Sequence, residues 1–212
     1  MQKPLISLRS IIQALDLDLA CITLLEQGNT RQSLLPYRSP ETVYTAIQTI
    51  GQQLNVRQQA DQLVEDLEER TNIIRHKLKF IPAEDRPKLW LLQDVSPLED
   101  AGNEYLSNLV TIAGGIVHSA AASDGQRPDS VIIITDQPIP QLLNRLPEAL
   151  ASNESLQTAA ENKGIYLIHN SNYLRQPGAQ IADDAEILAE ILHPKYFVFG
   201  RDKDVWMKFD WQ

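Results

Sequence analysis

The sequence predicts an α/β fold in which a mostly parallel, Rossmann-like sheet is flanked by helices on both faces. Short apolar runs rich in β-branched residues alternate with longer segments of helical periodicity. These runs lack the alternation of polar residues expected of a strand with one solvent-exposed face. Such continuous apolar runs are typical of buried parallel strands. A chain of 212 residues with 43% hydrophobic content can bury one sizeable core. We expect four strands, at residues 20–25, 89–94, 131–135 and 165–169.

Two helices are expected between the first two strands. Ser39 is the N-cap of the first helix, with Pro40 at its first helical position and Glu41 in its first turn. The second helix, over about residues 56–80, lacks Gly and Pro and forms a rod of roughly 36 Å. Its apolar residues fall on one stripe at helical spacing: Ala60, Leu63, Val64, Leu67, Ile74 and Leu78.

The second half of the chain continues the alternation. A helix over 104–115 ends at two glycines, another follows the third strand, and the last helix carries Asp183 and Asp184 at its positive end. Apolar and polar residues alternate in the final segment, which favours a strand or an extended lid. Its aromatic residues are Phe199, Trp206, Phe209 and Trp211.

Composition excludes several classes of function. The net charge is −9 and Lys and Arg form no cluster, so we expect no nucleic-acid partner. No apolar segment approaches 18 residues, so none is expected to span a membrane. Cys21 is the single cysteine, which rules out an internal disulfide, and its apolar surroundings predict a buried, inert thiol.

Signatures of catalysis are missing from the sequence. It contains no GxGxxG, Walker loop, GxSxG or HExxH pattern, and its four histidines, His76, His118, His169 and His193, have no metal-ligand spacing. His193 stands at the end of the last helix and Pro194 prevents its continuation, so we interpret His193 as a helix-ending residue. We expect no enzyme activity, no catalytic residue, no metal site and no cofactor.

Polar loops follow three of the strands. In open α/β sheets, ligands bind at the carboxyl ends of the strands, where these loops meet. They contain no nucleophile–base pair, so the pattern favours binding over catalysis, with solvated loops as the alternative for each residue alone. The loops offer Asp94, Ser96, Glu99, Asn103, Glu104 and Tyr105, then Asp136 and Gln137, then Asn170, Asn172, Tyr173 and Arg175.

Five segments in a fixed order resemble a known family. They are "SPETV" leading to the rod helix, "LVTIAGG", "PDSVIIITD", "NKGIYLIHNSNYLRQPG" and "AEILAEILHP". This order is similar to that of the substrate-binding proteins of ABC importers for iron–siderophore complexes and cobalamin. In that family one long helix joins two α/β lobes, and the resemblance covers roughly residues 35 to 197.

The resemblance divides the chain into three parts. Residues 1–35 resemble a remnant of the preceding lobe, 36–80 the connecting helices and 81–212 the carboxy-terminal lobe. Family members have about a hundred more residues before the rod helix, so the expectation is a fragment or a protein that has lost a lobe. A two-sided cleft is then not expected within one monomer.

The resemblance also implies roles for individual residues. The ligand-binding candidates are Ser96, Tyr105, Asp136, Asn172, Tyr173 and Arg175. An exposed acid would dock on the permease, at Glu104 or else Glu99, although an ordinary first-turn acid explains Glu104 equally well.

The leading hypothesis is a solute-binding component that delivers a metal chelate to an ABC permease and its ATPase, in the periplasm or cell envelope. The chain shows no secretory signal, which keeps a cytoplasmic protein as the alternative. A second hypothesis is a single-lobe interaction module that dimerises through the stripe of the long helix. A nucleotide-using enzyme ranks last, because no glycine fingerprint follows any strand.

Overall fold

A mixed six-stranded sheet organises the computed structural model, which describes residues 6–27, 36–37, 39–118, 127–162, 164–202 and 204–209. The strands are β1 Lys88–Val95, β2 Leu98–Asp100, β3 Ile116–His118, β4 Ser130–Ile134, β5 Ile165–Ile168 and β6 Trp206–Phe209. The helices are α1 Leu8–Ala14, α2 Cys21–Gln27, α4 Pro40–Gln53, α5 Arg57–Leu78, the 3₁₀ turn η1 Ala83–Asp85, α6 Glu104–Ile112, α7 Ile139–Ser152, α8 Glu154–Glu161 and α9 Ile181–Leu192.

The sheet has a parallel centre and antiparallel edges, in the order β2–β1–β4–β5–β6. β1 pairs in parallel with β4 and β4 with β5, whereas β2 and β6 run antiparallel to their neighbours. β3 lies parallel to the first residues of β1, on the edge that β2 continues. The predicted fold class is therefore confirmed, with strands at three of the four expected places.

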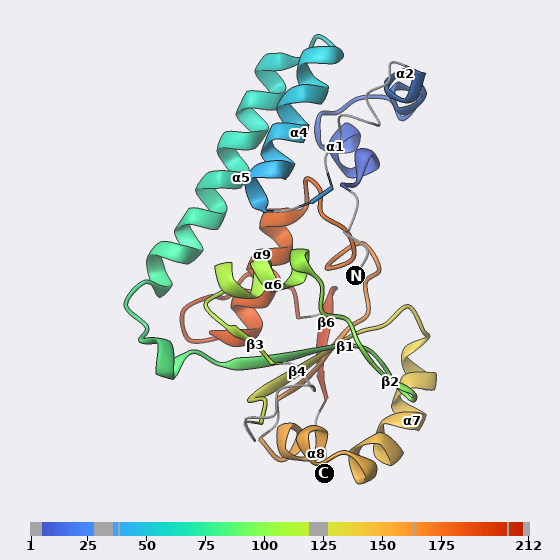
Figure 1. Ribbon diagram of the computed structural model, residues 1–212, viewed down its shortest axis with the longest axis vertical. Helices are drawn as coiled ribbons and strands as arrows, with labels where there is room; N and C mark the ends of the chain where they lie inside the picture. The colour runs from blue at the N-terminus through green and yellow to red at the C-terminus, as the bar shows by residue number, and fades with distance from the viewer. Residues whose placement is uncertain are drawn as a thin grey trace.

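Helices cover both faces of the sheet, and alternate residues of each central strand point to opposite cores (Figure 1). In β1, Leu89 and Leu91 join the core under α4, α5, α6 and α9, whereas Trp90 and Leu92 join the core under α7 and α8. Both faces exclude water, which explains why these strands read as continuous apolar runs rather than alternating ones.

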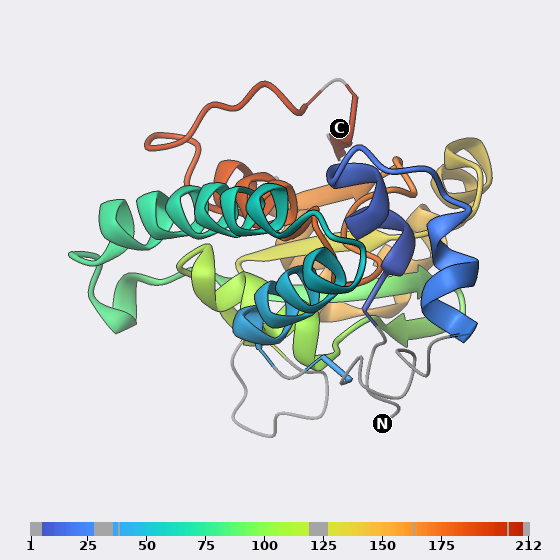
Figure 2. The ribbon, with the colours of Figure 1, turned by 90° about the horizontal axis from the view of Figure 1, so that it is seen from above.

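The rod predicted over residues 56–80 is α5, and it projects beyond the sheet beside α4 (Figure 1). Its apolar stripe packs on α4 and on α9, which lies alongside it over the sheet (Figure 2). Ala60, Val64, Leu67, Ile74 and Leu78 are all buried in this way within one chain. The stripe therefore needs no second copy to cover it, which removes the reason for expecting a dimer through this helix.

The expected first strand, residues 20–25, is wrong. Residues 21–25 lie in α2, and Asp18 precedes this helix and accepts a hydrogen bond from the Ala20 N–H at 2.7 Å. A short, mostly apolar run fits a strand or a helix equally well, and here no described strand pairs with it. Leu25 is buried but Leu24 is 62% exposed. Cys21 is only half-buried, so the buried thiol that we expected is also wrong.

The end of the tail forms strand β6, as the alternation of apolar and polar residues favours. This strand pairs with β5 at the edge of the sheet. Trp211 lies outside the described residues. The sequence did not reveal β2 and β3, whose three residues are too few for a pattern, or the division of the helix after β4 into α7 and α8. α9 ends as expected: His193 is its C-cap, and its N–H donates to the Ala189 carbonyl at 2.9 Å.

Arg70 joins the rod helix to α9 through charge-assisted hydrogen bonds. Its Nε and Nη2 donate to the two carboxylate oxygens of Glu186, both at 2.8 Å, and Nη2 also lies 2.9 Å from Asp183 Oδ1. Arg201, from the tail, donates to the same Asp183 oxygen at 2.7 Å. Bidentate pairing fixes the orientation of both partners, so this cluster sets the angle at which α5 crosses α9.

Glu190 holds the tail against α9. Its Oε1 accepts the backbone N–H groups of Phe199 and Gly200 at 2.6 and 2.7 Å. Its Oε2 accepts the Arg201 N–H and the indole N–H of Trp206, both at 3.2 Å. A buried carboxylate with four donors is well satisfied, and it places Trp206 at the start of β6.

The Glu190 contacts predict a specific stability effect. Glu190→Gln keeps the shape but turns an amide NH₂ towards donors, so we expect unfolding to require about 2–4 kcal/mol less free energy. Urea denaturation measures this loss, and hydrogen exchange should show faster exchange at the amides of residues 199–201. The exposed Glu65→Gln on α5 serves as the matched control and should stay within about 0.5 kcal/mol of the native chain. Equal stability of the two variants would contradict the anchoring role.

Candidate functional site

A cavity of about 870 Å³ opens between α1 and the loop that follows β5. One wall comes from α1 and the residue before it, and the other from Asp136 and residues 171–183, just beyond the carboxyl ends of β4 and β5. This is the edge of the sheet at which α/β proteins bind ligands. The lining residues are mainly polar: Ser7, Arg9, Ser10, Gln13, Ala14, Asp136, Ser171, Asn172, Tyr173, Arg175, Gln176, Ala179, Gln180 and Asp183.

Arg175 is held at the base of this cavity by two groups at the end of β4. Its Nη2 donates to the Thr135 carbonyl at 2.7 Å, and its Nε lies 3.1 Å from Asp136 Oδ1. Burial lowers the pKa of Arg175, and the nearby Asp136 carboxylate counteracts that effect. A guanidinium nevertheless stays protonated at neutral pH, so the cavity contains a fixed positive charge with an exposed carboxylate beside it.

Tyr173 shares this wall and is oriented by a cation. The guanidinium of Arg201 lies 6.0 Å from the centre of its ring, while Arg201 also bonds Asp183. A cation over one face restricts the rotation of the ring and keeps it at the cavity wall. Asn170 shapes the same loop, because its side chain accepts the Asn172 N–H at 3.1 Å.

Asp184 supports the loop from inside the core. It is fully buried, its Oδ1 accepts the Leu174 N–H at 2.9 Å, and its Oδ2 accepts the Tyr105 hydroxyl at 2.6 Å. Leu174 has a φ of 58°, a left-handed conformation that a branched residue adopts only when its surroundings hold it there. The buried carboxyl thus fixes the backbone between Tyr173 and Arg175.

Burial changes the protonation of this carboxyl. Removal from water raises the pKa of Asp184 to about 7, although the hydrogen bonds from Tyr105 and Leu174 favour its charged form. Burial also raises the pKa of the Tyr105 hydroxyl, so it remains a donor.

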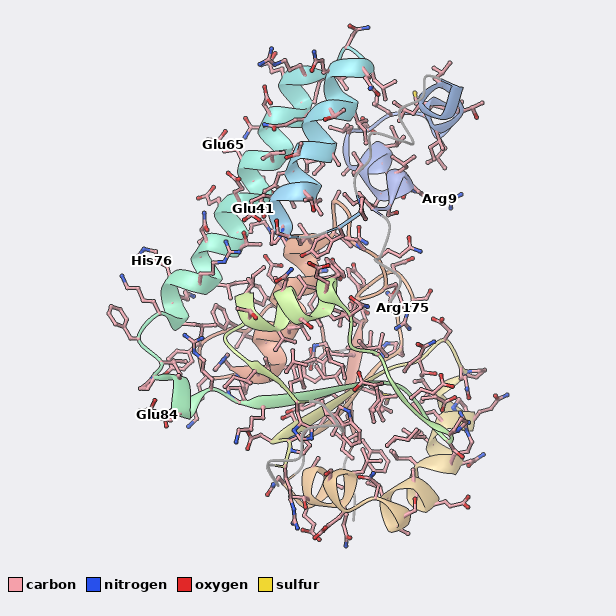
Figure 3. The ribbon with its side chains drawn as sticks, viewed as in Figure 1. Arg9, Glu41, Glu65, His76, Glu84 and Arg175 are labelled. Atoms are coloured by element: carbon pink, nitrogen blue, oxygen red, sulfur yellow. The ribbon has the colours of Figure 1, made fainter. Side chains whose placement is uncertain are left out.

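Helix α1 forms the opposite wall because it is bonded to the loop after β5. The Ser7 N–H donates to the Pro177 carbonyl at 2.7 Å, and the Ala179 N–H donates to Ser10 Oγ at 3.1 Å. A Cβ on Gly178 would lie 2.1 Å from Ser10 Oγ, so this close approach requires glycine. In this chain α1 therefore supplies the second side of the cavity. Figure 3 labels Arg9 and Arg175, one on each wall, on the side of the molecule away from α5.

The structure brings together four of the six residues that the sequence singled out for ligand binding. Asp136, Asn172, Tyr173 and Arg175 all line the cavity. Ser96 lies outside the cavity lining, and its carbonyl accepts a hydrogen bond from Arg145 at 2.7 Å.

Tyr105 needs a correction. It lies one residue into α6 and is fully buried, stacked edge-on against Tyr37 and bonded to Asp184. Helical periodicity turns this position inward, so it cannot contact a ligand and instead supports the loop that can.

The two docking candidates are both on the surface. Glu104 is exposed in the first turn of α6, and Glu99 is exposed at the centre of β2.

The sequence reasoning missed the α1 wall. A signal was available: Ser7 caps the helix by accepting the Ser10 N–H, and Leu8, Ile11, Ile12 and Leu15 repeat at helical spacing. That pattern predicts a helix, but nothing in it reveals that the helix lies against residues 177–179, about 170 positions later.

The loop after β1 is fixed by a separate polar cluster. Asp94 accepts hydrogen bonds from the Gln137 amide at 2.5 Å and from Arg145 Nη2 at 3.0 Å, and Arg145 also bonds the Gln137 side chain. These contacts satisfy the polar groups within the cluster, which ties the carboxyl ends of β1 and β4 to α7.

The surroundings of His193 indicate a structural role. It is buried at the end of α9, and burial lowers its pKa, an effect that the nearby backbone of Gly114 and Ala113 partly offsets. Among the described residues, no three His, Cys, Asp or Glu side chains are grouped as a metal site would require. Over the same residues, no helix combines the length and the apolarity needed to cross a lipid bilayer.

Searches by sequence found no matching family model and no match among curated proteins. Solved structures do match. The haem-complexed IsdE of S. aureus superposes with a TM-score of 0.62 at 15% identity, over 82% of this chain and 74% of that one. An ABC transporter substrate-binding protein from Listeria monocytogenes gives 0.60 at 15% identity, over 84% and 75%.

A third match is an ABC-type Fe³⁺-hydroxamate transport protein from Saccharomonospora viridis. Its TM-score is 0.53 at 18% identity, over 73% of this chain and 56% of that one. At these identities the matches show the fold. The resemblance to importer substrate-binding proteins is thus confirmed at the level of architecture.

The Asp184 environment predicts an unusual pH dependence of stability. The pKa is 3.8 for an ordinary Asp and about 7 in the folded chain, so the fold keeps a proton that the unfolded chain loses. This contribution to stability is therefore complete below pH 3.8 and is lost as the pH rises towards 7. Asp184→Asn, which is uncharged throughout, should gain roughly 2–4 kcal/mol relative to the native chain over that interval.

Urea denaturation at several pH values measures this difference. Asp85→Asn, at an exposed position on η1, is the control and should follow the native profile. Asp184→Ala leaves the Tyr105 hydroxyl and the Leu174 N–H without an acceptor and should be destabilised by about 2–4 kcal/mol at every pH. An unchanged pH profile in Asp184→Asn would show that this carboxyl is ionised in the folded chain.

Proposed function

We propose that this protein is the solute-binding component of an ABC importer for iron–siderophore or cobalamin-type metal complexes. The observation that carries the proposal is the two-sided polar cavity of about 870 Å³ at the carboxyl edge of the sheet. The fold supports it, because the matched structures include an ABC transporter substrate-binding protein and an Fe³⁺-hydroxamate transport protein. No step of catalysis is part of this role.

The lining favours a hydrophilic chelate. Apart from two alanines and Tyr173, the residues around the cavity carry hydroxyl, amide or charged groups. Arg9 and Arg175 supply cations that suit the carboxylate or hydroxamate oxygens of a siderophore, and Tyr173 offers a ring for stacking. A large apolar macrocycle would leave these polar groups unsatisfied. The metal ion would enter as part of the ligand, held by the chelating groups of the ligand.

Delivery would require contact with a permease. Glu104 and Glu99 are exposed carboxylates on α6 and β2, and we propose them as docking residues for permease cations. Charged residues at the edge of an interface influence the association rate and the choice of partner more than they influence the affinity. The role would place the protein in the periplasm or at the cell envelope, and the matched structures include a protein described as periplasmic, from Pseudomonas aeruginosa.

Isothermal titration with ferric hydroxamate and catecholate siderophores and with cobalamin tests ligand binding. Arg9→Gln and Asn172→Ala alter exposed cavity residues, so they should fold normally and each weaken binding by about tenfold. Ser96→Ala is the control, since Ser96 lies outside the lining and should bind as the native chain does. Heat from no ligand in either class would refute importer function for this chain and favour a single-lobe interaction module.

A further inference from the structure

A second cavity, of about 390 Å³, lies at the end of the rod helix and shares no lining residue with the first. Four parts of the chain enclose it: the last turn of α5, the residue after η1, the second half of α6 and the start of α4. Its lining residues are Pro40, Arg75, Leu78, Lys79, Arg86, Asn108, Thr111, Ile112 and Gly114.

Three of these residues are cations, and the lining includes no acid. Arg75, Lys79 and Arg86 converge here in a chain whose net charge is −9. Within the described part of the chain, none of the three has a carboxylate within ion-pair distance. Like charges that line one cavity repel one another, so an anion between them would stabilise the cluster.

Arg86 adds an unused donor. It is half-buried, and its Nε has no hydrogen-bond partner among the described residues although that atom is shielded from solvent. A shielded N–H costs free energy unless it is paired. Arg75 makes one long hydrogen bond, to Asn72 at 3.3 Å, and so retains most of its donors.

The acids Glu41, Glu84 and Asp85 lie close to Pro40 or Arg86 in the chain. Glu41 follows Pro40, and its pKa is lowered by hydrogen bonds from the Ser39 side chain and its own backbone N–H, and by Arg75. Its carboxylate therefore occupies the start of α4 and offsets part of the positive potential. Glu84 is exposed on η1 and points away from the body of the molecule (Figure 3). His193 lies behind Gly114, and burial lowers its pKa, so it adds no charge at neutral pH.

We propose that this second cavity binds an oxyanion of the phosphate class, either free phosphate or the headgroup of an anionic lipid. Two guanidinium groups offer paired donors that match the spacing of phosphate oxygens, and the Lys79 ammonium adds a point charge. A lipid source has its own support in Phe80, which is 82% exposed and has the Lys79 ammonium 4.7 Å from its ring centre. The site does not depend on the proposed solute-binding role.

Phosphate titration followed by NMR of the labelled protein tests the site directly. We expect saturable shifts at the amides around Arg86 and Gly114, with a Kd of about 1 mM. Arg86→Gln and Arg75→Gln should each weaken binding about tenfold, since each removes charge-assisted hydrogen bonds. Arg57→Gln changes an exposed cation at the other end of α5 and is the matched control, expected to bind normally.

Glu41→Gln is expected to change the phosphate affinity in the opposite direction to the arginine substitutions. Removing the opposing carboxylate should tighten phosphate binding about threefold, which damage to the fold would not do. Vesicles of phosphatidylcholine with and without phosphatidylserine form the second arm, read by co-sedimentation.

Vesicle binding that needs both phosphatidylserine and Arg86 identifies the lipid as the source of the anion. Saturable phosphate binding without vesicle binding identifies the free anion. The proposal is overturned if neither ligand binds, or if phosphate binds the native chain, Arg86→Gln and Arg75→Gln equally.

Discussion

Helix α9 brings four carboxylates to the interior or its border, and each is bonded to a segment distant in the sequence. Glu186 and Asp183 hold Arg70 of the rod helix, Glu190 holds the tail, and Asp184 holds Leu174 and α6. Burying four acidic side chains costs free energy unless each one has hydrogen-bond or ion-pair partners. The segments that supply those partners must therefore lie against α9. The rod, the tail and the loop after β5 are therefore positioned by one helix.

This constraint extends to the candidate site. Asp184 holds Leu174 in its left-handed conformation, which places Tyr173 and Arg175 on the cavity wall. Asp183 acts from the other side by fixing Arg201, whose guanidinium lies over the Tyr173 ring. The polar cavity that supports a binding role thus depends on groups that a ligand would not touch. The same helix helps to hold α5, whose last turn contributes Arg75 and Lys79 to the second cavity.

Helix α1 supplies the second wall of the candidate cavity. A second lobe normally provides the opposite wall in the family that the sequence resembles. Here Ser7 and Ser10 bond residues 177–179, so seven residues of helix form that wall. Ile11 and Ile12 on the inner face of α1 are fully buried in the core, so this wall is held by apolar packing as well as by hydrogen bonds.

Local pattern in the sequence determined most of the architecture: the three buried strands, the rod with its stripe, the caps at Ser39 and His193, and four residues of the cavity wall. These depend on periodicity, propensity and strand-end position, which act over a few residues. Only the tertiary structure decided that residues 21–25 form a helix, that Tyr105 points into the core and that α1 faces Gly178. Those outcomes depend on which partner each segment meets, and contacts between residues 10 and 179 leave no trace in local sequence.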